Sequence, residues 1–408
     1  MEKNKNKSIL IIILISIIIV LLFVSGYFII NKNLTKNKEN TNKSTTTTTT
    51  ISTTTTTKIE RVDTKPIIQN STYDYKTNFS YSSNIKGKYN NFLKNLKKSI
   101  NENFEEYTNY ILYGSSDYLG TGYEFTLTKD NKILFNTYDK KYNNYTLATD
   151  ALNMFLIQEG NGRYYYLYFI NEGGNLFKFC IDCLEYQNPT ITKENVNYIV
   201  SVKQGLFDFE YGETSFIFID IDGNIITDST YDSTKNNGIG KYKNNNITIK
   251  NSSYNYEKKL IYSNNIKNDY NTFISNINTN TKNKFGNNGG IYLTGKSMYL
   301  NTSYSLVLAN NQILFSTNDN KYNNYVISEN VLNISLVETG NGGYKTLYFI
   351  KNDGNLYSFC IDCIAENNIL IEKENVSYIV DVIEGAIDYE FSGANGPIYI
   401  DLDGNIIM

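Results

Sequence analysis

All four cysteines of the 408-residue chain lie in two copies of one short motif. Cys180-Ile181-Asp182-Cys183 returns about 180 residues later as Cys360-Ile361-Asp362-Cys363. Four thiolates could hold a tetrahedral zinc ion if the fold joins the motifs, and a C-x-x-C at a helix N-terminus supports redox exchange. We favour a disulfide within each motif, because the chain carries the signals of an exported protein, in which cysteines are oxidised. Free thiols and pairing between the copies stay open as alternatives.

Paired acids are the second pattern with chemical potential. Asp208 is followed by Glu210, and Asp388 by Glu390. Glycoside hydrolases work with two carboxyl groups placed across the scissile bond. A spacing of two residues puts both acids on one face of a strand, which suits a solvated face better than the two walls of a cleft. A carbohydrate-active hydrolase is therefore our alternative hypothesis.

Two further loops carry oxygen ligands at alternate positions. Asp220-Ile221-Asp222-Gly223-Asn224 and Asp401-Leu402-Asp403-Gly404-Asn405 resemble the start of a calcium loop. Both lack a third acid before the glycine and the distal glutamate of an EF-hand. Apolar, β-branched runs flank both segments, so we interpret them as tight hairpin turns rather than metal sites.

A tyrosine-containing loop is also repeated. The segment 141–145 (Lys-Tyr-Asn-Asn-Tyr) returns as 321–325. Tyr142, Tyr145, Tyr322 and Tyr325 are therefore candidates for stacking on a glycan or a peptide. The alternative is that these rings pack on their own domain.

The composition excludes several classes of chemistry. The chain has no histidine, which removes Ser-His-Asp and Cys-His catalysis and every histidine metal ligand. The net charge is −3 and no basic cluster occurs outside the N-terminal region, which argues against nucleic-acid binding. We expect no cofactor, with zinc at the cysteines as the one exception we considered.

The elements that must position these residues are written twice. Asn70–Tyr75 returns as Asn251–Tyr256, with small insertions and deletions between the copies. We place repeat 1 at residues 66–229, a linker rich in Asn, Lys and Gly at 230–246, and repeat 2 at 247–408. The duplication therefore concerns whole folding units.

Each copy is predicted to open with a helix. In the first copy the apolar residues recur at spacings of three and four: Tyr89, Phe92, Leu93, Leu96, Ile100, Phe104 and Tyr107. The second copy retains Tyr270, Phe273, Ile274, Ile277 and Phe285. Because Thr281 stands where Ile100 stood, we expect its helix to be shorter or frayed.

Hairpins are predicted to follow. Aromatic and β-branched runs at 125–135, 167–177 and 216–226 are interrupted by Gly, Asn and Asp, which is typical of antiparallel meanders. Within each copy a finer repeat of strand, glycine, loop and aromatic strand recurs after 45 to 49 residues, near the length of a propeller blade.

The segment 376–382 (Val-Ser-Tyr-Ile-Val-Asp-Val), followed by Gly385 and by 398–405 (Ile-Tyr-Ile-Asp-Leu-Asp-Gly-Asn), resembles β-propeller repeats of the regulator-of-chromosome-condensation type. This chain lacks the histidine and tryptophan usual in those blades. The resemblance implies a propeller shape rather than an activity. We therefore predict a mainly β fold with short helices, built of tandem antiparallel meanders and propeller-like, with two separate helix-plus-sheet domains as the alternative.

The N-terminal region predicts a membrane anchor. Residues 9–30 form 22 uncharged and mostly apolar residues, about 33 Å of helix against a bilayer core of about 30 Å. A cleaved signal peptide is the alternative, but the run is long for one. We assign 1–8 to a cytoplasmic tail, 9–30 to a transmembrane signal-anchor and 31–65 to a Thr-rich disordered stalk.

These patterns together favour a single-pass protein of the cell membrane whose exported, duplicated body is a non-enzymatic binding or structural module. Its partners are the lipid bilayer, through residues 9–30, and an unknown extracellular ligand, either a glycan or a protein. Both copies keep their turns, aromatic strands and cysteine pairs, and no acid, base and nucleophile stand together. The alternatives are the hydrolase and a zinc or redox protein.

Overall fold

The computed structural model describes these residues: 65–73, 75, 81–104, 109–159, 164–185, 187–208, 213–227, 248–253, 260–285, 290–339, 344–366, 370–388 and 394–408. The tail, the anchor over 9–30, the linker and all of the stalk except Lys65 lie outside them. In the ranges that are described, no helix is long and apolar enough to cross a bilayer. The predicted anchor is therefore neither supported nor opposed.

The described part of the first copy consists of one α-helix, one short 3-10 helix and twelve strands: β1(Ile67–Asn70), α2(Ile85–Asn103), β2(Asn109–Ser116), β3(Thr121–Leu127), β4(Ile133–Thr137), β5(Tyr145–Ala148), β6(Ala151–Glu159), β7(Tyr164–Asn171), β8(Leu176–Cys180), η1(Asp182–Glu185), β9(Thr190–Lys193), β10(Ile199–Asp208), β11(Glu213–Asp220) and β12(Ile225–Ile226).

The described part of the second copy repeats these elements in the same order: β13(Thr248–Asn251), α3(Ile266–Phe285), β14(Gly290–Ser297), β15(Thr302–Ala309), β16(Gln312–Thr317), β17(Tyr325–Glu329), β18(Val331–Thr339), β19(Tyr344–Lys351), β20(Leu356–Cys360), η2(Asp362–Glu366), β21(Leu370–Lys373), β22(Ile379–Asp388), β23(Ala394–Asp401) and β24(Ile406–Ile407). The fold is mainly β, and the predicted hairpins at 125–135, 167–177 and 216–226 are confirmed as β3–β4, β7–β8 and β11–β12.

Each copy contributes one five-stranded sheet of its own. The order is β1-β9-β8-β7-β6 in the first copy and β13-β21-β20-β19-β18 in the second. All neighbours are antiparallel except at one edge, where β1 and β13 add in parallel to β9 and β21. These sheets carry the cysteine motifs at the ends of β8 and β20.

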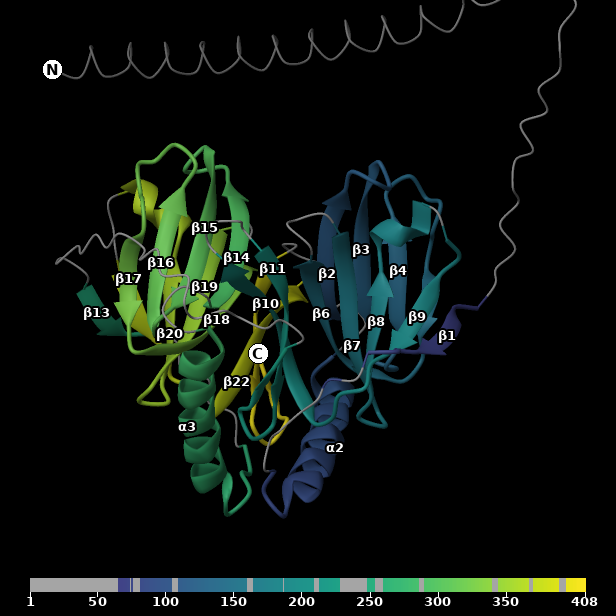
Figure 1. Cartoon of the computed structure of the whole chain (residues 1–408), viewed down its shortest axis with the longest axis horizontal. Helices are drawn as coiled ribbons and strands as arrows, with labels where there is room; N and C mark the ends of the chain where they lie inside the picture. Colours follow the sequence, from purple (N-terminus) through teal and green to yellow (C-terminus); the bar gives the residue numbers. More distant parts are fainter. Residues whose placement is uncertain are drawn as a thin grey trace, which may run out of the picture. The chain divides into compact units, whose positions relative to one another are not determined.

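The two seven-stranded sheets, in contrast, are each shared between the copies. Their orders are β12-β11-β10-β14-β15-β16-β17 and β24-β23-β22-β2-β3-β4-β5. The junctions are β10 with β14, where Gly205 lies opposite Ile291, and β2 with β22, where Tyr110 lies opposite Gly385. Figure 1 shows β10, β11 and β22 in the middle of the body, between strands of both copies.

This sharing corrects both expected architectures. No closed propeller forms among the described residues, because hairpins of different copies join edge to edge in a sheet instead of forming separate blades. Two separate domains do not form either, since each copy supplies strands to a sheet of the other. The sequence pattern predicted the hairpins, but tertiary contacts decide which hairpins become neighbours in a sheet.

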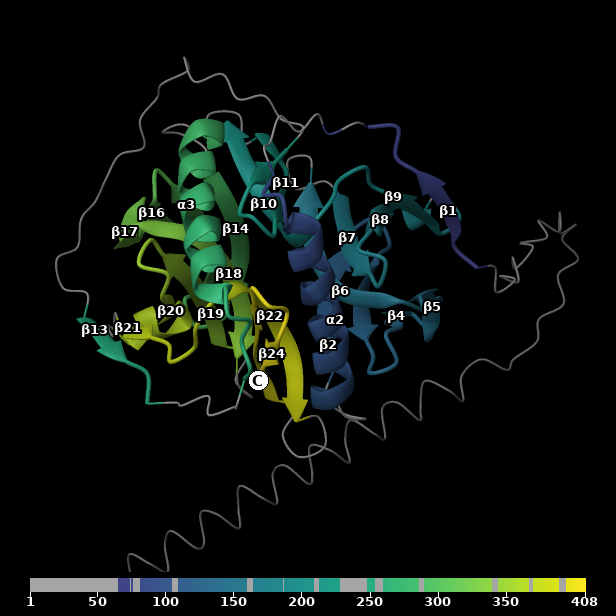
Figure 2. The ribbon, with the colours of Figure 1, turned by 90° about the horizontal axis from the view of Figure 1, so that it is seen from below.

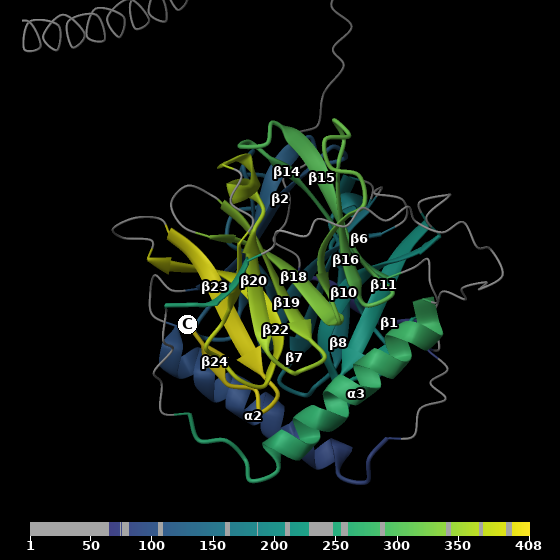
Figure 3. The ribbon, with the colours of Figure 1, turned by 90° about the vertical axis from the view of Figure 1, so that its left-hand side faces the viewer.

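The two helices lie at the same end of the body and come close to each other (Figures 2 and 3). In α2 the predicted stripe is confirmed, with Phe92, Leu96 and Ile100 fully buried. The expectation for the second helix was wrong, because α3 is as long as α2 and continues to Phe285. Thr281 is buried within it, so packing of the neighbouring apolar residues outweighs the loss of one apolar position.

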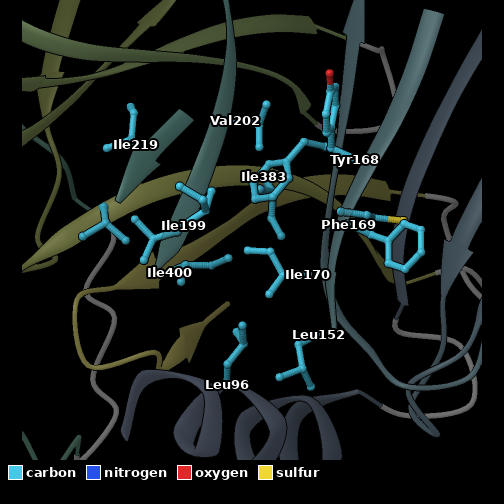
Figure 4. Packing of buried hydrophobic residues seen from close by; sticks show 14 of the residues in the cluster. Leu96, Leu152, Tyr168, Phe169, Ile170, Ile199, Val202, Ile219, Ile383 and Ile400 are labelled. Carbon is cyan, nitrogen blue, oxygen red and sulfur yellow. The ribbon is translucent and has the colours of Figure 1, made fainter. Parts of the chain in front are cut away.

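The main core also runs through both copies. Figure 4 shows Leu96 of α2 beneath Leu152, Ile170 and Ile199, with Ile383 and Ile400 of the second copy packed among them. A second cluster lies mainly in the second copy, around Phe315 and Phe359, and includes Phe207 of the first copy. Apolar burial of this kind is the main stabilising term of a fold, so here it also holds the copies together.

The Asp-Gly-Asn turns dock on the helix of the opposite copy. Gly223 has φ +83° and lies so close to α3 that an added Cβ would sit 2.2 Å from the carbonyl oxygen of Phe273. Gly404, at φ +85°, meets the carbonyl oxygen of Phe92 in α2 in the same way. The sequence predicted these turns, but not their position between the copies.

Candidate functional site

The structure closes one disulfide within each cysteine motif. Cys180 is bonded to Cys183 and Cys360 to Cys363, and none of the cysteines is free. In both motifs the strand ends at the first cysteine and a 3-10 turn, η1 or η2, brings the second one back. The sequence analysis did not predict this turn, without which residues i and i+3 of a straight strand would face opposite sides.

The zinc alternative has no geometric support in the described ranges. Each sulfur is used in a bond with its own motif partner. The described residues also contain no group of three or more Cys, Asp or Glu side chains arranged to hold a metal ion.

The four candidate tyrosines belong to the packing of their own sheets. Tyr142 is 2% exposed and packs on Phe135, and Tyr145 meets its ring edge to face at 5.6 Å. Tyr322 and Tyr325 form the equivalent pair in the second copy, at 5.7 Å. The alternative interpretation, in which the rings pack on their own domain, therefore applies to these four residues.

The acid pairs proposed for hydrolysis lie at the ends of strands. Asp208 ends β10 and Asp388 ends β22, whereas Glu210 and Glu390 are outside the described residues. The hydrolase hypothesis on these four acids is therefore left as a sequence prediction.

Asp220 and Asp401, the first residues of the Asp-Gly-Asn turns, are buried, and their carboxyl groups hydrogen-bond to later residues of the same turns. Asp220 accepts hydrogen bonds from the backbone N–H groups of Asp222 and Asn224 and from the Asn224 side chain, at 2.8–3.0 Å. Burial nevertheless raises the pKa of Asp220 to about 6 and that of the equivalent Asp401 to about 7. These acids are structural, as the turn interpretation implied.

The strongest candidate site is a cavity where the two copies meet. It has a volume of about 340 Å³ and lies between strands of all four sheets. Its polar lining side chains come from both copies: Tyr113, Gln158, Tyr165, Lys203, Gln204, Thr294, Ser335, Lys345, Asp381 and Glu384. Apolar and aromatic groups such as Phe155, Ile157 and Leu336 complete its wall.

A buried ion pair lies in this cavity wall and joins the copies. The Lys203 Nζ lies 2.6 Å from Asp381 Oδ1 and 2.8 Å from Ser335 Oγ. The side chains of Lys203 and Asp381 are 9% and 0% exposed. The second oxygen of Asp381, Oδ2, has no hydrogen-bond partner among the described residues, although an unpaired buried acceptor is costly.

One side of the cavity, which we call the acidic side, is lined by Glu384, Lys345 and Tyr113, and Glu338 contacts both Lys345 and Glu384. Glu338 forms an ion pair with Lys345, and its backbone N–H donates to Glu384 at 3.1 Å. The Tyr113 hydroxyl hydrogen-bonds both carboxyl groups. Burial and the nearby charge of Glu338 raise the pKa of Glu384.

The other side, which we call the amide side, is formed by the equivalent positions of the opposite copies: Gln158, Gln204, Tyr165 and Thr294. Gln158 and Gln204 stand where Glu338 and Glu384 stand in the second copy, and Tyr165 stands where Lys345 stands. Thr294 takes the place of Tyr113. The amide side is therefore uncharged.

Two other hollows are larger but less distinctive. About 510 Å³ lies along α3 beside the 352–355 turn, and about 480 Å³ lies between α2 and the segment 261–265. Lys88 of α2 is ion-paired with Asp222 and, at 3.5 Å, with Asp269 at the border of the second hollow. We did not find in either hollow a buried polar atom that lacks a described partner.

Sequence reasoning missed the central cavity. Its residues lie on eight strands and form no local motif, so nothing in their spacing marked them. The copies do differ in charge here, for example at Lys203 against Ile383, but they differ in charge elsewhere too, for example at Lys178 against Ser358. A comparison of the copies by sequence alone therefore does not single out the cavity.

The comparisons with known proteins do not identify the chain. No family model matches it, and no curated protein matches it. Two similar solved structures are a SapL1 lectin in complex with alpha methyl fucoside and BBS1N in complex with ARL6DN, soaked with mercury. The first is 11% identical with a TM-score of 0.31 and covers 74% of this chain and 95% of its own. The second is 9% identical with a TM-score of 0.22, covering 74% and 91%. At these scores neither likeness supports an argument about fold or ligand.

Proposed function

We propose that the duplicated body is a non-enzymatic binding module whose ligand site is the central cavity between the copies. The observation that carries the proposal is Gln204, whose side chain lines the cavity and forms no hydrogen bond with any described residue. A primary amide of this kind is satisfied when a ligand exchanges hydrogen bonds with it. A concave site with a few convergent polar groups among apolar side chains is the usual form of a small-molecule site.

The ligand class that fits is a small polar molecule with hydrogen-bond donors. The cavity volume of about 340 Å³ lies at the lower end of the range for small-molecule sites. Lys203 and Ser335 hold Asp381 Oδ1 and so fix this buried carboxylate in the wall. The charged groups of the wall are largely paired, which favours recognition by hydrogen bonds over recognition by net charge.

A fragment screen by ligand-observed NMR tests this proposal. Hits should be found for polar fragments with the native protein and should be lost with Leu336→Trp, which fills the cavity. Leu300→Trp is the matched control, because Leu300 packs against the core away from the cavity. Hits that survive Leu336→Trp would place binding elsewhere and refute the cavity as the site.

The hydrolase alternative gains one observation at this cavity. Glu338 and Glu384 lie together, both interact with Tyr113, and burial raises the pKa of Glu384. A carboxyl group with a raised pKa is suited to act as a general acid. Turnover of glycosides that disappears in Glu384→Gln, without loss of melting temperature, would favour this alternative over the binding module.

We also propose, from the sequence alone, that residues 9–30 anchor the body outside the cell. The length of the apolar run supports a span, and the short N-terminal tail favours its retention in the cytoplasm. Protease added to intact cells should remove the body and leave a small protected fragment. Protection of the whole chain would contradict the orientation.

A further inference from the structure

The two sides of the central cavity are equivalent in fold but not in hydrogen bonding. Both are built from the same strands of the repeat, β6, β7, β10 and β14 on the amide side and β18, β19, β22 and β2 on the acidic side. Any difference between them therefore comes from side chains and not from backbone geometry. Four differences between the copies account for it: Gln158 for Glu338, Gln204 for Glu384, Tyr165 for Lys345 and Thr294 for Tyr113.

The acidic side is satisfied by its own residues. Lys345 neutralises Glu338, and Glu384 accepts from the Glu338 backbone N–H. Tyr113 interacts with both carboxyl groups, which together with its burial raises its pKa. A ligand entering here would have to break these hydrogen bonds and ion pairs before it could replace them.

The amide side has hydrogen-bonding capacity left. The Gln204 side chain is 8% exposed and makes no hydrogen bond with any described residue. Thr294, which takes the place of Tyr113, has a short side chain and is itself exposed. Beside it, the partly buried ring of Tyr165 supplies an aromatic surface and a hydroxyl.

We propose that the amide side binds an uncharged polyhydroxylated ligand, a neutral pyranose, with Gln204 as the specificity-determining residue. This inference rests on the proposed function and names its ligand class. A primary amide is both donor and acceptor, so it matches a hydroxyl group, which is also both. Tyr165 lines the cavity and offers its ring to the apolar face of the sugar. A charged ligand would find no counter-charge on this side.

Calorimetric titration of the full chain with three methyl glycosides tests the ligand class: a neutral hexoside, a glucosaminide with a free amine, and a glucuronide. The neutral hexoside, tried as the gluco, galacto and manno forms, should bind saturably, and the two charged sugars at least ten-fold more weakly. Gln204→Leu, which keeps the volume but removes the amide, should weaken the neutral hexoside at least ten-fold. Gln312→Leu is the matched control outside the cavity and should change the affinity less than two-fold.

The outcomes separate this inference from the proposed function. Tightest binding of the glucosaminide, lost in Glu384→Gln but kept in Gln204→Leu, would overturn the neutral ligand while leaving the cavity as a site. No binding of any sugar, together with fragment hits lost in Leu336→Trp, would likewise refute only the sugar. Fragment hits that are indifferent to Leu336→Trp would refute both. Melting temperatures of all variants show that each is folded when it is tested.

Discussion

At the scale of single residues, the pair of Lys203 and Asp381 is the main charge feature of the body. It occurs once, although the fold is duplicated, because Ser201 and Ile383 occupy the equivalent positions. A buried ion pair gains little over an apolar pair of similar volume, but leaving one charge alone is costly. The pair therefore specifies which strands meet more than it adds stability.

Replacing Lys203 by Met should lower the free energy of unfolding by about 3–5 kcal/mol, because Asp381 is left as an uncompensated buried charge. The double variant Lys203→Met with Asp381→Leu should recover much of this loss. Lys97→Met, which removes a half-exposed pair with Glu172, is the control and should cost about 0–1 kcal/mol. Denaturant unfolding measures all three, and equal losses for both lysines would contradict the assignment.

The pH dependence of stability follows from Asp220 and Asp401. Their folded pKa values of about 6 and about 7 exceed the value of about 3.9 in an unfolded chain. The folded state thus binds more protons, so its extra stability is full below about pH 4 and is lost as pH rises to about 7. Asp220→Asn and Asp401→Asn should flatten this decline in chemical unfolding curves, while Glu102→Gln, at an exposed carboxyl, is the control. A free energy of unfolding that rises between pH 4 and pH 7 would contradict this prediction.

The two disulfides should be small local stabilisers. Each closes a loop of four residues, for which chain entropy predicts about 2 kcal/mol. Cys183→Ser or Cys363→Ser should thus lower the melting temperature and leave the circular dichroism spectrum unchanged. Intact mass after alkylation checks the bonds themselves, since label should enter only after reduction. Label entering the unreduced protein would show free thiols.

At the scale of elements, each Asp-Gly-Asn turn is hydrogen-bonded to the helix of the opposite copy and so joins the two copies. Asn276 of α3 donates to the carbonyl of Asp222 at 2.7 Å, and Asn95 of α2 to that of Asp403 at 2.9 Å. The helices are amphipathic by sequence, but short helices gain most of their stability from packing of this kind. This explains why α3 tolerates Thr281 and keeps its full length.

Gly223→Ala and Gly404→Ala should each destabilise the body by more than about 1 kcal/mol, because the backbone is left-handed and the added Cβ meets a carbonyl oxygen. Gly87→Ala in α2 is the control, since no atom lies within 4 Å of its added Cβ. Gly87→Ala should stabilise by up to about 1 kcal/mol through helix propensity. Thermal melts of the three variants decide the matter, and neutral effects at both turns would contradict the close docking.

At the scale of the whole molecule, the shared sheets make the two copies one folding unit. The β10–β14 and β2–β22 junctions and the common core mean that a single copy would expose a sheet edge and apolar surface. The cavity exists because both copies meet there, so the candidate site depends on the duplication. A single repeat has neither its complete sheets nor the paired sides of that cavity.

The fragment 65–229 should therefore not fold as a monomer. We expect it to aggregate or to form a dimer in which a second fragment replaces the missing copy. Light scattering after size exclusion, with far-UV circular dichroism, distinguishes these states. A monomer that unfolds cooperatively would show that the repeat is independent after all.

The sequence by itself determined the duplication, the apolar stripe of α2, the hairpins and the Asp-Gly-Asn turns, and it favoured the local pairing of the cysteines over the alternatives. Each of these depends on residues a few positions apart, whose periodicity and turn preferences are visible in the chain. Only the tertiary structure decided that hairpins of different copies share sheets, that Tyr142 and its equivalents are packed in the sheets, and that Lys203 meets Asp381. Those contacts join residues far apart in the chain, and the pattern of one strand does not specify which strand edge it pairs with.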